Sequence, residues 1–151
     1  MKTNDTLRTP PHIWRTFGPI DLDPCAGLET CIGATNYALE RGENGLELPW
    51  FGFIYCNPPF SEKEAWADKC IQHRNGLLML PERGSAPWFG PLAKEAGHYW
   101  VMGQKINFEG GPSSNNLGSV IFPFGYEAVI RLLKSGLPGH LVEVKTFRPR
   151  A

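Results

Sequence analysis

The sequence has no net charge, because its 15 Lys and Arg residues are balanced by 15 Asp and Glu residues. A broad positive field, of the kind that holds many nucleic-acid-binding proteins against phosphate groups, is therefore excluded. If the protein contacts nucleic acid, we expect the contact to depend on a few local side chains.

Long apolar segments are also missing. No stretch approaches the ~18 consecutive apolar residues of a membrane-spanning helix. The segment MKTNDTLRTPPHIW, residues 1–14, lacks the apolar core of a signal peptide. We therefore expect a cytoplasmic protein with no membrane partner.

Cysteine patterns typical of metal sites are absent as well. Cys25, Cys31, Cys56 and Cys70 are irregularly spaced and include no Cys-x-x-Cys pair. Without paired histidines nearby, this spacing argues against structural zinc, and we expect no metal. Two of the cysteines lie in strand-like or turn contexts and are interpreted as small buried side chains, which favours a reducing compartment over a disulfide scaffold.

The chain does contain a series of short apolar runs, each ended by proline, glycine or polar residues. Continuous apolar runs of this length are typical of strands buried on both faces. The runs cover residues 20–23, 51–56, 76–80, 98–102 and 119–124, and residues 139–150 suggest one last strand with a basic tail.

Three segments between these runs have a helical pattern. The first begins at Ser61, a candidate N-cap with Glu64 in the capping-box position, and extends to residue 74. The other two, residues 86–97 and 126–136, each end at a glycine suited to a left-handed cap.

Alternation of buried strands with helices predicts an α/β fold, with a mostly parallel central sheet and helices on both faces. The length of 151 residues fits a single domain spanning residues 1–151. In sheets of this kind, ligands bind beyond the carboxyl ends of the strands. The unusual motifs of this sequence fall at those ends.

The first motif is DLDPCAGLET, residues 21–30. A strand ends near Asp23, and the small residues that follow it let a ligand approach the backbone closely. An ordinary strand-to-helix turn has the same pattern, so the motif alone does not identify a site.

The second motif is YCNPPF, residues 55–60. Two prolines end a strand and turn the chain, so that the Asn57 side chain and the Pro58 carbonyl can face one point beside the ring of Phe60. Two oxygen acceptors beside a flat ring suit a planar group that carries an NH2, because each acceptor takes one N–H.

NPPF resembles the (Asp/Asn/Ser)-Pro-Pro-(Tyr/Phe) motif of S-adenosylmethionine-dependent amino-methyltransferases, and DPCAGLET resembles their cofactor loop. The ordered set RTPPHIW, IDLDPCAG, ENGLELPW, FIYCNPPFS and LLMLPER is similar, in order and spacing, to small phage-type DNA N-6-adenine methyltransferases. The similarity extends from about Thr9 to about Phe124. It implies a Rossmann-like methyltransferase fold, S-adenosylmethionine as methyl donor, DNA as partner and protection of a phage genome from restriction.

The resemblance also implies roles for single residues. The catalytic loop would be Asn57, Pro58, Pro59 and Phe60. The cofactor would be bound by Thr9, Pro10, Asp23, Cys25, Ala26, Asn44 and Leu46, with Glu40 as the acidic partner of its ribose. Two positions depart from the family pattern, because Glu29 replaces a loop glycine and Asn44 replaces a carboxylate.

The chemistry of adenine fits the same loop. Its exocyclic nitrogen is a poor nucleophile, and accepting both of its hydrogens at Asn57 and Pro58 favours a more tetrahedral nitrogen that attacks in line. The oxygen dipoles stabilise the positive charge that develops there more than they stabilise the ground state. Alignment of the reactants supplies much of the remaining rate. The base would be flipped out of the duplex and stacked on Phe60.

DNA contacts are expected from short loops, since no long insertion is available as a recognition domain. Residues 81–89 and 110–118 are the candidate loops. The candidate side chains are Arg83, Trp88 and Lys105, with Lys145, Arg148 and Arg150 in the tail. Charged surface residues are more often simply solvated, and Trp88 could instead cover the edge of the core.

The sequence therefore predicts an enzyme that methylates N6 of adenine in DNA. NPPF would serve equally for N4 of cytosine or for a glutamine side chain in a protein, since each presents a planar NH2 to the same acceptors. A non-catalytic binding module derived from a methyltransferase is the alternative from another class, favoured by the departures at Glu29 and Asn44.

Overall fold

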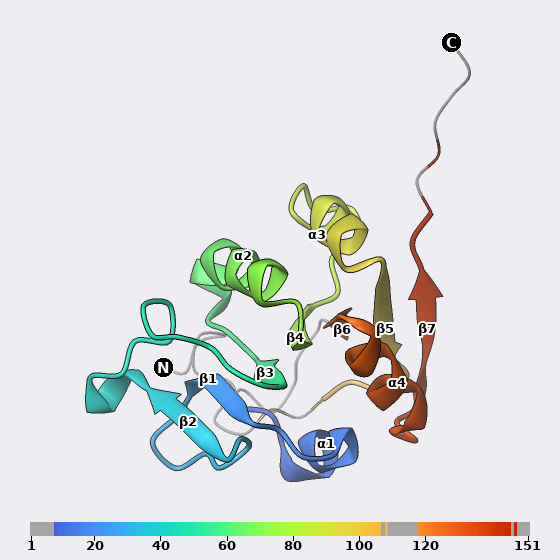
Figure 1. The fold of residues 1–151 in the computed structure, drawn as a ribbon. Coiled ribbons are helices and arrows are strands. Elements are labelled where there is room, and N and C mark those ends of the chain that lie inside the picture. Colours follow the sequence, from blue (N-terminus) through green and yellow to red (C-terminus); the bar gives the residue numbers. More distant parts are fainter. Residues whose placement is uncertain (1–7, 107, 109–117, 146, 148–151) are drawn as a thin grey trace.

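The protein has an α/β fold built on one sheet (Figure 1). The structure, a computed structural model, describes residues 8–106, 108, 118–145 and 147. In these residues there are seven strands: β1 (Leu22–Ala26), β2 (Thr35–Ala38), β3 (Ile54–Cys56), β4 (Gly76–Pro81), β5 (His98–Met102), β6 (Ser119–Phe124) and β7 (Gly139–Glu143). The same residues form four α-helices: α1 (Pro11–Trp14), α2 (Lys63–His73), α3 (Phe89–Ala96) and α4 (Tyr126–Lys134). Three 3-10 helices accompany them: η2 (Arg15–Phe17), η3 (Leu39–Arg41) and η4 (Phe60–Glu62).

The strands lie in the order β2-β1-β3-β4-β6-β5-β7. The pairings among β2, β1, β3 and β4 are parallel, whereas β6 is antiparallel to both β4 and β5, and β7 is antiparallel to β5. The sheet is therefore mixed, and the expected parallel pairing describes only the half that contains β1 to β4.

Each face of the sheet carries its own apolar cluster, because successive side chains of a strand point to opposite faces. Leu77 and Met79 of β4 join the cluster that includes Phe17 and Leu132, on the side of η2 and α4. Leu78, which lies between them in the strand, joins the cluster on the side of α2 and α3. Figure 1 shows α2 and α3 on one side of the sheet and α1 and α4 on the other. Helices on both faces agree with the expected α/β layering.

The chain reverses its direction of travel across the sheet at β1. It passes from β1 outward to β2, then crosses β1 to continue at β3 and β4 on the other side. Ligands of open α/β sheets bind at such a switch point, outside the carboxyl ends of the strands. The turn after Ala26 and the loop after Cys56 therefore lie at the edge of the sheet where a ligand is expected.

Several expected boundaries are corrected by the structure. Helix α2 follows the 3-10 turn η4, and its N-cap is Glu62, without a side-chain capping hydrogen bond. Ser61 is therefore not the N-cap, because it lies inside the 3-10 turn that begins directly after Pro59. At the other helices, Gly97 and Gly136 have φ of 78° and 75°, which confirms the predicted glycine ends.

Strand β1 begins later than predicted and extends further, through Pro24 to Ala26. The pairing with β2 is irregular between Asp23 and Ala26, and this irregularity accommodates a proline that has no N–H to donate. Strand β2 is not indicated by any apolar run in the sequence. It is an edge strand of mixed composition, Thr-Asn-Tyr-Ala, and the connection from β1 contains no helix.

Candidate functional site

A cavity of about 580 Å³ lies at the carboxyl ends of β1, β2 and β3. This volume is within the range of small-molecule sites, roughly 300–1,000 Å³. Four parts of the chain contribute to it: the segment before α1, the turn after β1, the segment after β2, and the NPPF loop with the start of α2. The lining residues are Arg8, Pro24, Cys25, Ala26, Gly27, Leu28, Glu29, Tyr37, Leu39, Glu40, Glu43, Asn44, Gly45, Asn57, Pro59, Glu62 and Trp66.

The cavity brings together residues that the sequence assigned to two separate roles. Of the predicted cofactor and catalytic residues, those that line it are Cys25, Ala26, Glu40, Asn44, Asn57 and Pro59. The remaining ones, Thr9, Pro10, Asp23, Leu46, Pro58 and Phe60, are described but do not line it. Arg8 and Glu62 line it without having been predicted as site residues, although Arg8 is the first residue of RTPPHIW and Glu62 directly follows FIYCNPPFS.

Asn57 is held by a chain of hydrogen bonds that leads into the core. Its Nδ2 donates to Oγ1 of Thr9 at 3.1 Å, and Thr9 Oγ1 lies 2.6 Å from the hydroxyl of Tyr55. The Tyr55 hydroxyl in turn donates to the sulfur of Met79 at 3.4 Å. Because the amide nitrogen is engaged in this way, the Asn57 oxygen is the side-chain atom that can accept from a ligand N–H. Thr9 thus acts on the NPPF loop rather than on the cavity directly.

Asp23 lies behind the cavity wall. Its side chain is 3% exposed, and Oδ1 accepts a hydrogen bond from the Cys25 N–H at 3.1 Å. Loss of solvation raises the pKa of Asp23 to about 7, although the Cys25 hydrogen bond opposes the shift. Burial also raises the pKa of Cys25, followed by repulsion from Asp23, Glu62 and Glu40, so this thiol stays protonated at neutral pH.

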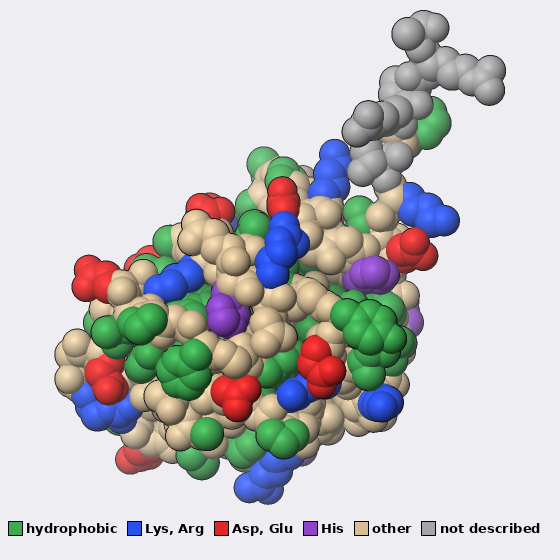
Figure 2. Space-filling view, in the orientation of Figure 1, with side chains coloured by type: hydrophobic (Ala, Val, Ile, Leu, Met, Phe, Trp, Pro, Cys, Tyr) green, Lys and Arg blue, Asp and Glu red, His purple; other side chains and the backbone are tan. Residues whose placement is uncertain are grey.

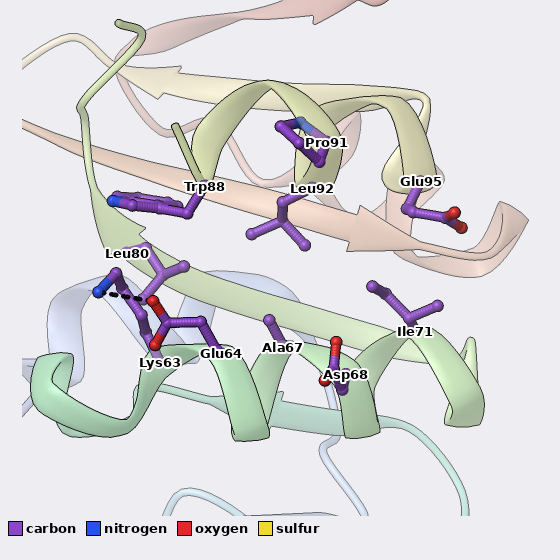
Figure 3. A pocket seen from close by; sticks show the side chains of 10 residues that line it. All are labelled: Lys63, Glu64, Ala67, Asp68, Ile71, Leu80, Trp88, Pro91, Leu92 and Glu95. Atoms are coloured by element: carbon purple, nitrogen blue, oxygen red, sulfur yellow. Dashed lines mark ion pairs between the residues drawn. The ribbon is translucent and has the colours of Figure 1, made fainter. Parts of the chain in front are cut away.

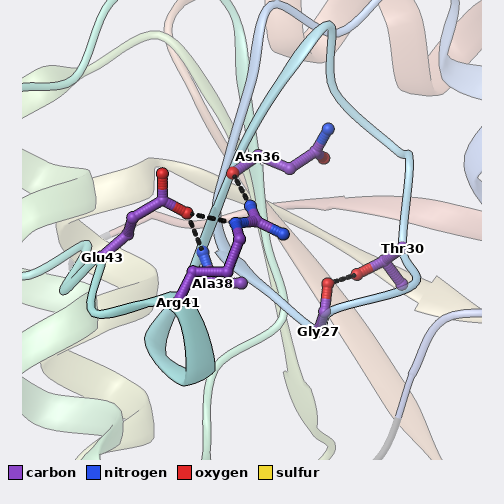
Figure 4. A network of polar contacts seen from close by, with 6 residues as sticks. All are labelled: Gly27, Thr30, Asn36, Ala38, Arg41 and Glu43. Carbon is purple, nitrogen blue, oxygen red and sulfur yellow. Dashed lines mark hydrogen bonds and ion pairs between the residues drawn. The ribbon is translucent and has the colours of Figure 1, made fainter.

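Most of the charged side chains that line the cavity are acidic. In the described part of the chain, the lining carboxylates are Glu29, Glu40, Glu43 and Glu62, and the single lining cation is Arg8. Glu43 is compensated locally (Figure 4): its carboxylate accepts from Arg41 at 2.8 Å and from the Ala38 N–H at 3.1 Å. These hydrogen bonds lower the pKa of Glu43. The cavity consequently favours a ligand that carries positive charge.

The segment that presents Asn44 and Gly45 is fixed by Lys69 of α2. The Lys69 ammonium donates to the carbonyls of Gly45, Leu46 and Leu48 at 2.9, 3.0 and 2.6 Å. Partial burial lowers the pKa of Lys69. The Asn44 side-chain oxygen accepts from the Leu46 N–H at 3.0 Å, so this residue shapes its own turn.

Gly45 has no room for a side chain. A Cβ at this position would lie 1.9 Å from the carbonyl oxygen of Pro24. Only glycine therefore lets the segment after β2 pack against the turn after β1. Trp66 closes the cavity from α2, is 5% exposed and stacks on Trp50 with 6.4 Å between ring centroids. Trp66 is thus part of the apolar core as well as of the cavity lining.

Beside the NPPF loop, two rings and two cations form what we call the aromatic–cationic cluster: Phe60, Lys63, Arg83 and Trp88. The rings of Phe60 and Trp88 meet edge to face, with centroids 6.1 Å apart. Lys63 Nζ lies 4.3 Å and the Arg83 guanidinium carbon 5.8 Å from the centre of the Phe60 ring. Two predicted DNA contacts, Arg83 and Trp88, are thus close to the predicted catalytic ring.

The other predicted DNA contacts are less informative. Lys105 and Lys145 are exposed, and Arg148 and Arg150 lie outside the described residues, as does most of the loop at 110–118. On the face seen in Figure 2, basic and acidic side chains are interspersed. This distribution agrees with the prediction that any contact with nucleic acid is local.

A second hollow of about 340 Å³ lies between α2 and α3 (Figure 3). Apolar side chains such as Ile71 and Leu92 line it, and Glu64, Asp68 and Glu95 add carboxylates. It shares Lys63 and Trp88 with the aromatic–cationic cluster, so it continues from that cluster along the two helices.

Comparison of the chain with protein-family models, curated protein sequences and solved structures finds no match. Across residues 8–106, 108, 118–145 and 147, no three or more His, Cys, Asp or Glu side chains gather in a way that could hold a metal ion. Among the described helices, none is both long and apolar enough to cross a membrane. The function must therefore be argued from the chemistry of the cavity.

Proposed function

We propose that the protein transfers a methyl group from S-adenosylmethionine to N6 of adenine in DNA, on a single Rossmann-like domain. One observation carries the proposal: the NPPF loop and the small-residue turn after β1 line the same cavity at the switch point of the sheet. These are the two motifs that resemble the catalytic loop and the cofactor loop of amino-methyltransferases.

The charges of the cavity support this cofactor, which supplies a methyl group activated on a positively charged sulfur. Its amino acid end adds an ammonium and a carboxylate. Glu29, Glu40 and Glu62 favour a cation of this kind by simple attraction and disfavour the phosphates of a dinucleotide. Glu40, in η3 just beyond β2, is the residue proposed for the ribose hydroxyls, and Asn44 is proposed for the adenine end.

Methyl transfer to an amine needs acceptors rather than a base or a metal. We assign the Asn57 oxygen and the Pro58 carbonyl as acceptors for the two N–H bonds of the target amine. The amine nitrogen bonds to the methyl carbon as the carbon–sulfur bond breaks, the electron pair stays on sulfur, and a nitrogen-bound proton leaves to water. The two oxygens stabilise the positive charge that grows on nitrogen during this step.

The aromatic–cationic cluster supports a nucleic-acid acceptor over a protein glutamine. The edge-to-face rings of Phe60 and Trp88 offer aromatic surface to a flipped base, and Lys63 and Arg83, which lie over the Phe60 ring, bring positive charge to the same place. N4 of cytosine remains the alternative acceptor, because the same two oxygens would serve it. Protection of a genome from restriction is the biological role that the phage resemblance suggests.

The proposal is tested by incubating the purified protein with labelled S-adenosylmethionine and unmodified DNA, followed by mass analysis of the nucleosides. We expect N6-methyladenine. The variant Asn57→Ala is expected to lose about 100-fold or more in rate while its affinity for the cofactor, measured by calorimetry, stays the same. Gln72→Ala removes an exposed amide on α2 and serves as the control.

Each other outcome has a defined meaning. N4-methylcytosine as the product would support methyl transfer but make cytosine, not adenine, the acceptor. Cofactor binding without turnover on any DNA would favour the binding module, and absence of cofactor binding would refute the proposal.

A further inference from the structure

Among the described residues that line the cavity, Arg8 is the one with a positive charge, and part of its side chain has no partner. Its Nε is buried and makes no hydrogen bond, among the described residues. The side chain lies over the turn after β1, since a Cβ built on Gly27 would be 3.5 Å from Arg8 Cδ and 3.9 Å from Nη1. The guanidinium is thereby positioned at the end of the cavity formed by that turn.

A buried guanidinium N–H without an acceptor is costly, and proteins normally satisfy such groups. The cavity contains carboxylates, yet Arg8 forms no ion pair with Glu29, Glu40 or Glu62 among the described contacts. An acceptor brought by a ligand would satisfy the group. Guanidinium binds carboxylate with two parallel hydrogen bonds, which makes a carboxylate the best-matched acceptor.

The surrounding charges narrow the chemical class of that ligand. A phosphate would gain from Arg8 but would be repelled by the three carboxylates. A zwitterionic amino acid group matches both signs, because its carboxylate meets Arg8 while its ammonium and a nearby cationic centre meet the glutamates.

We propose that Arg8 binds the α-carboxylate at the amino acid end of S-adenosylmethionine and so selects ligands that retain this carboxylate. The inference rests on the proposed function. It places the amino acid end of the ligand against Gly27 and leaves the part of the cavity near Asn44 and Gly45 for the nucleoside end. Arg8 is a binding residue in this assignment and takes no part in the transfer step.

The test compares two ligands by calorimetry: S-adenosylmethionine and its decarboxylated analogue, which keeps the sulfonium, ammonium and nucleoside. For Arg8→Ala we expect affinity for S-adenosylmethionine to fall by about 10- to 100-fold, as for loss of a charged hydrogen-bonded pair. Affinity for the analogue should change by less than about twofold, because it offers no carboxylate. The affinity of Arg8→Lys for S-adenosylmethionine should lie between those of Arg8→Ala and of the natural protein. Arg15→Ala, on an exposed arginine of η2, is the control for lost charge.

The outcomes distinguish a failure of this inference from a failure of the proposed function. If Arg8→Ala weakens the binding of both ligands equally, or of neither, Arg8 does not bind the carboxylate. The assignment of S-adenosylmethionine as the cofactor then still stands. If the natural protein binds neither ligand, the proposed function fails and this inference fails with it. Thermal unfolding of Arg8→Ala and of Arg8→Gln identifies any loss of folding, and the variant that keeps the natural melting temperature decides the comparison.

Discussion

Asp23 is a carboxyl group held in an apolar setting at the end of β1. Its pKa, raised to about 7 by burial, lies above the value of 3.8 expected in the unfolded chain. Between these values the folded protein holds a proton that the unfolded chain releases. The free energy of unfolding therefore falls as pH rises from about 4 to about 7, by up to roughly 4 kcal/mol, and this contribution is constant above that range.

Asp23→Asn is expected to remove this dependence, because the amide is neutral at every pH and still accepts from the Cys25 N–H. Urea unfolding from pH 4.5 to 8 should show a flatter profile than the natural protein and greater stability at pH 8. Asp68→Asn, on the exposed side of α2, should leave the natural profile unchanged. Equal slopes for Asp23→Asn and the natural protein would show that Asp23 titrates normally.

Thr9 connects the segment before α1 to the NPPF loop through its hydroxyl, which accepts from the Asn57 amide. Thr9→Val keeps the shape but leaves the Asn57 amide without its acceptor. We expect a loss of about 1–2 kcal/mol in unfolding free energy. The single-turnover rate of methyl transfer should fall about tenfold, since Asn57 is then free to rotate.

Tyr55→Phe is the matched control. It removes the neighbouring hydroxyl but preserves the bond between Asn57 and Thr9. This variant should lose stability in urea unfolding and keep its transfer rate. If both variants slow transfer to the same extent, the effect comes from the general packing of the buried network and not from the position of Asn57.

At the scale of single residues, the sequence predicted the cavity residues that lie in short local motifs. Asn57, Cys25 and Ala26 were predicted, and the structure places them on one cavity, because a strand end followed by prolines or small residues has a local signature. Arg8 lies in the segment RTPPHIW but was not predicted as a site residue. Its side chain approaches Gly27, 19 positions later in the chain, and no local pattern encodes that approach.

Among the elements, the strands were predicted where a run is apolar throughout. β5 and β6 match the predicted ranges, since both sides of each strand are covered and the runs end abruptly. β2 was missed because an edge strand needs fewer apolar residues. The start of α2 was misplaced because η4 already turns the chain at Phe60, which gives Ser61 a helical context without making it a cap.

The segment between β2 and β3 depends on α2 through one side chain. Lys69 gives three hydrogen bonds to carbonyls at 45, 46 and 48, in a segment that has little regular structure of its own. Lys69→Met retains most of the stem and removes the ammonium. We expect a loss of about 2–3 kcal/mol in unfolding free energy, because the carbonyls lose a charged donor.

Hydrogen exchange distinguishes a local effect from a global one. In Lys69→Met, the amides of residues 44–48 should exchange faster than those of β4, and cofactor affinity should fall because Asn44 and Gly45 line the cavity. Lys94→Met, an exposed position on α3, should change neither quantity. Uniformly faster exchange across the sheet would contradict the proposed local role.

For the whole molecule, charge balance limits how DNA can be bound. The chain has no net charge, and the cations that lie against the Phe60 ring of the NPPF loop are Lys63 and Arg83 of the aromatic–cationic cluster. Binding to DNA should therefore release few counterions. The slope of log K against log salt concentration is about −0.9 for each phosphate neutralised, so a slope of about −2 is expected for two contacts.

Arg83→Ala should make this slope shallower by about one and weaken binding to all sequences alike, because a phosphate contact carries no sequence information. The measurement is fluorescence anisotropy on a labelled duplex at several salt concentrations. Lys134→Ala removes an exposed cation from α4, which packs on the opposite face of the sheet, and should leave the slope unchanged. A slope of about −6 or steeper, or equal effects of the two substitutions, would mean that DNA is held by a wider surface than the cluster beside the NPPF loop. The neutral composition would then conceal a basic face formed by residues far apart in the sequence.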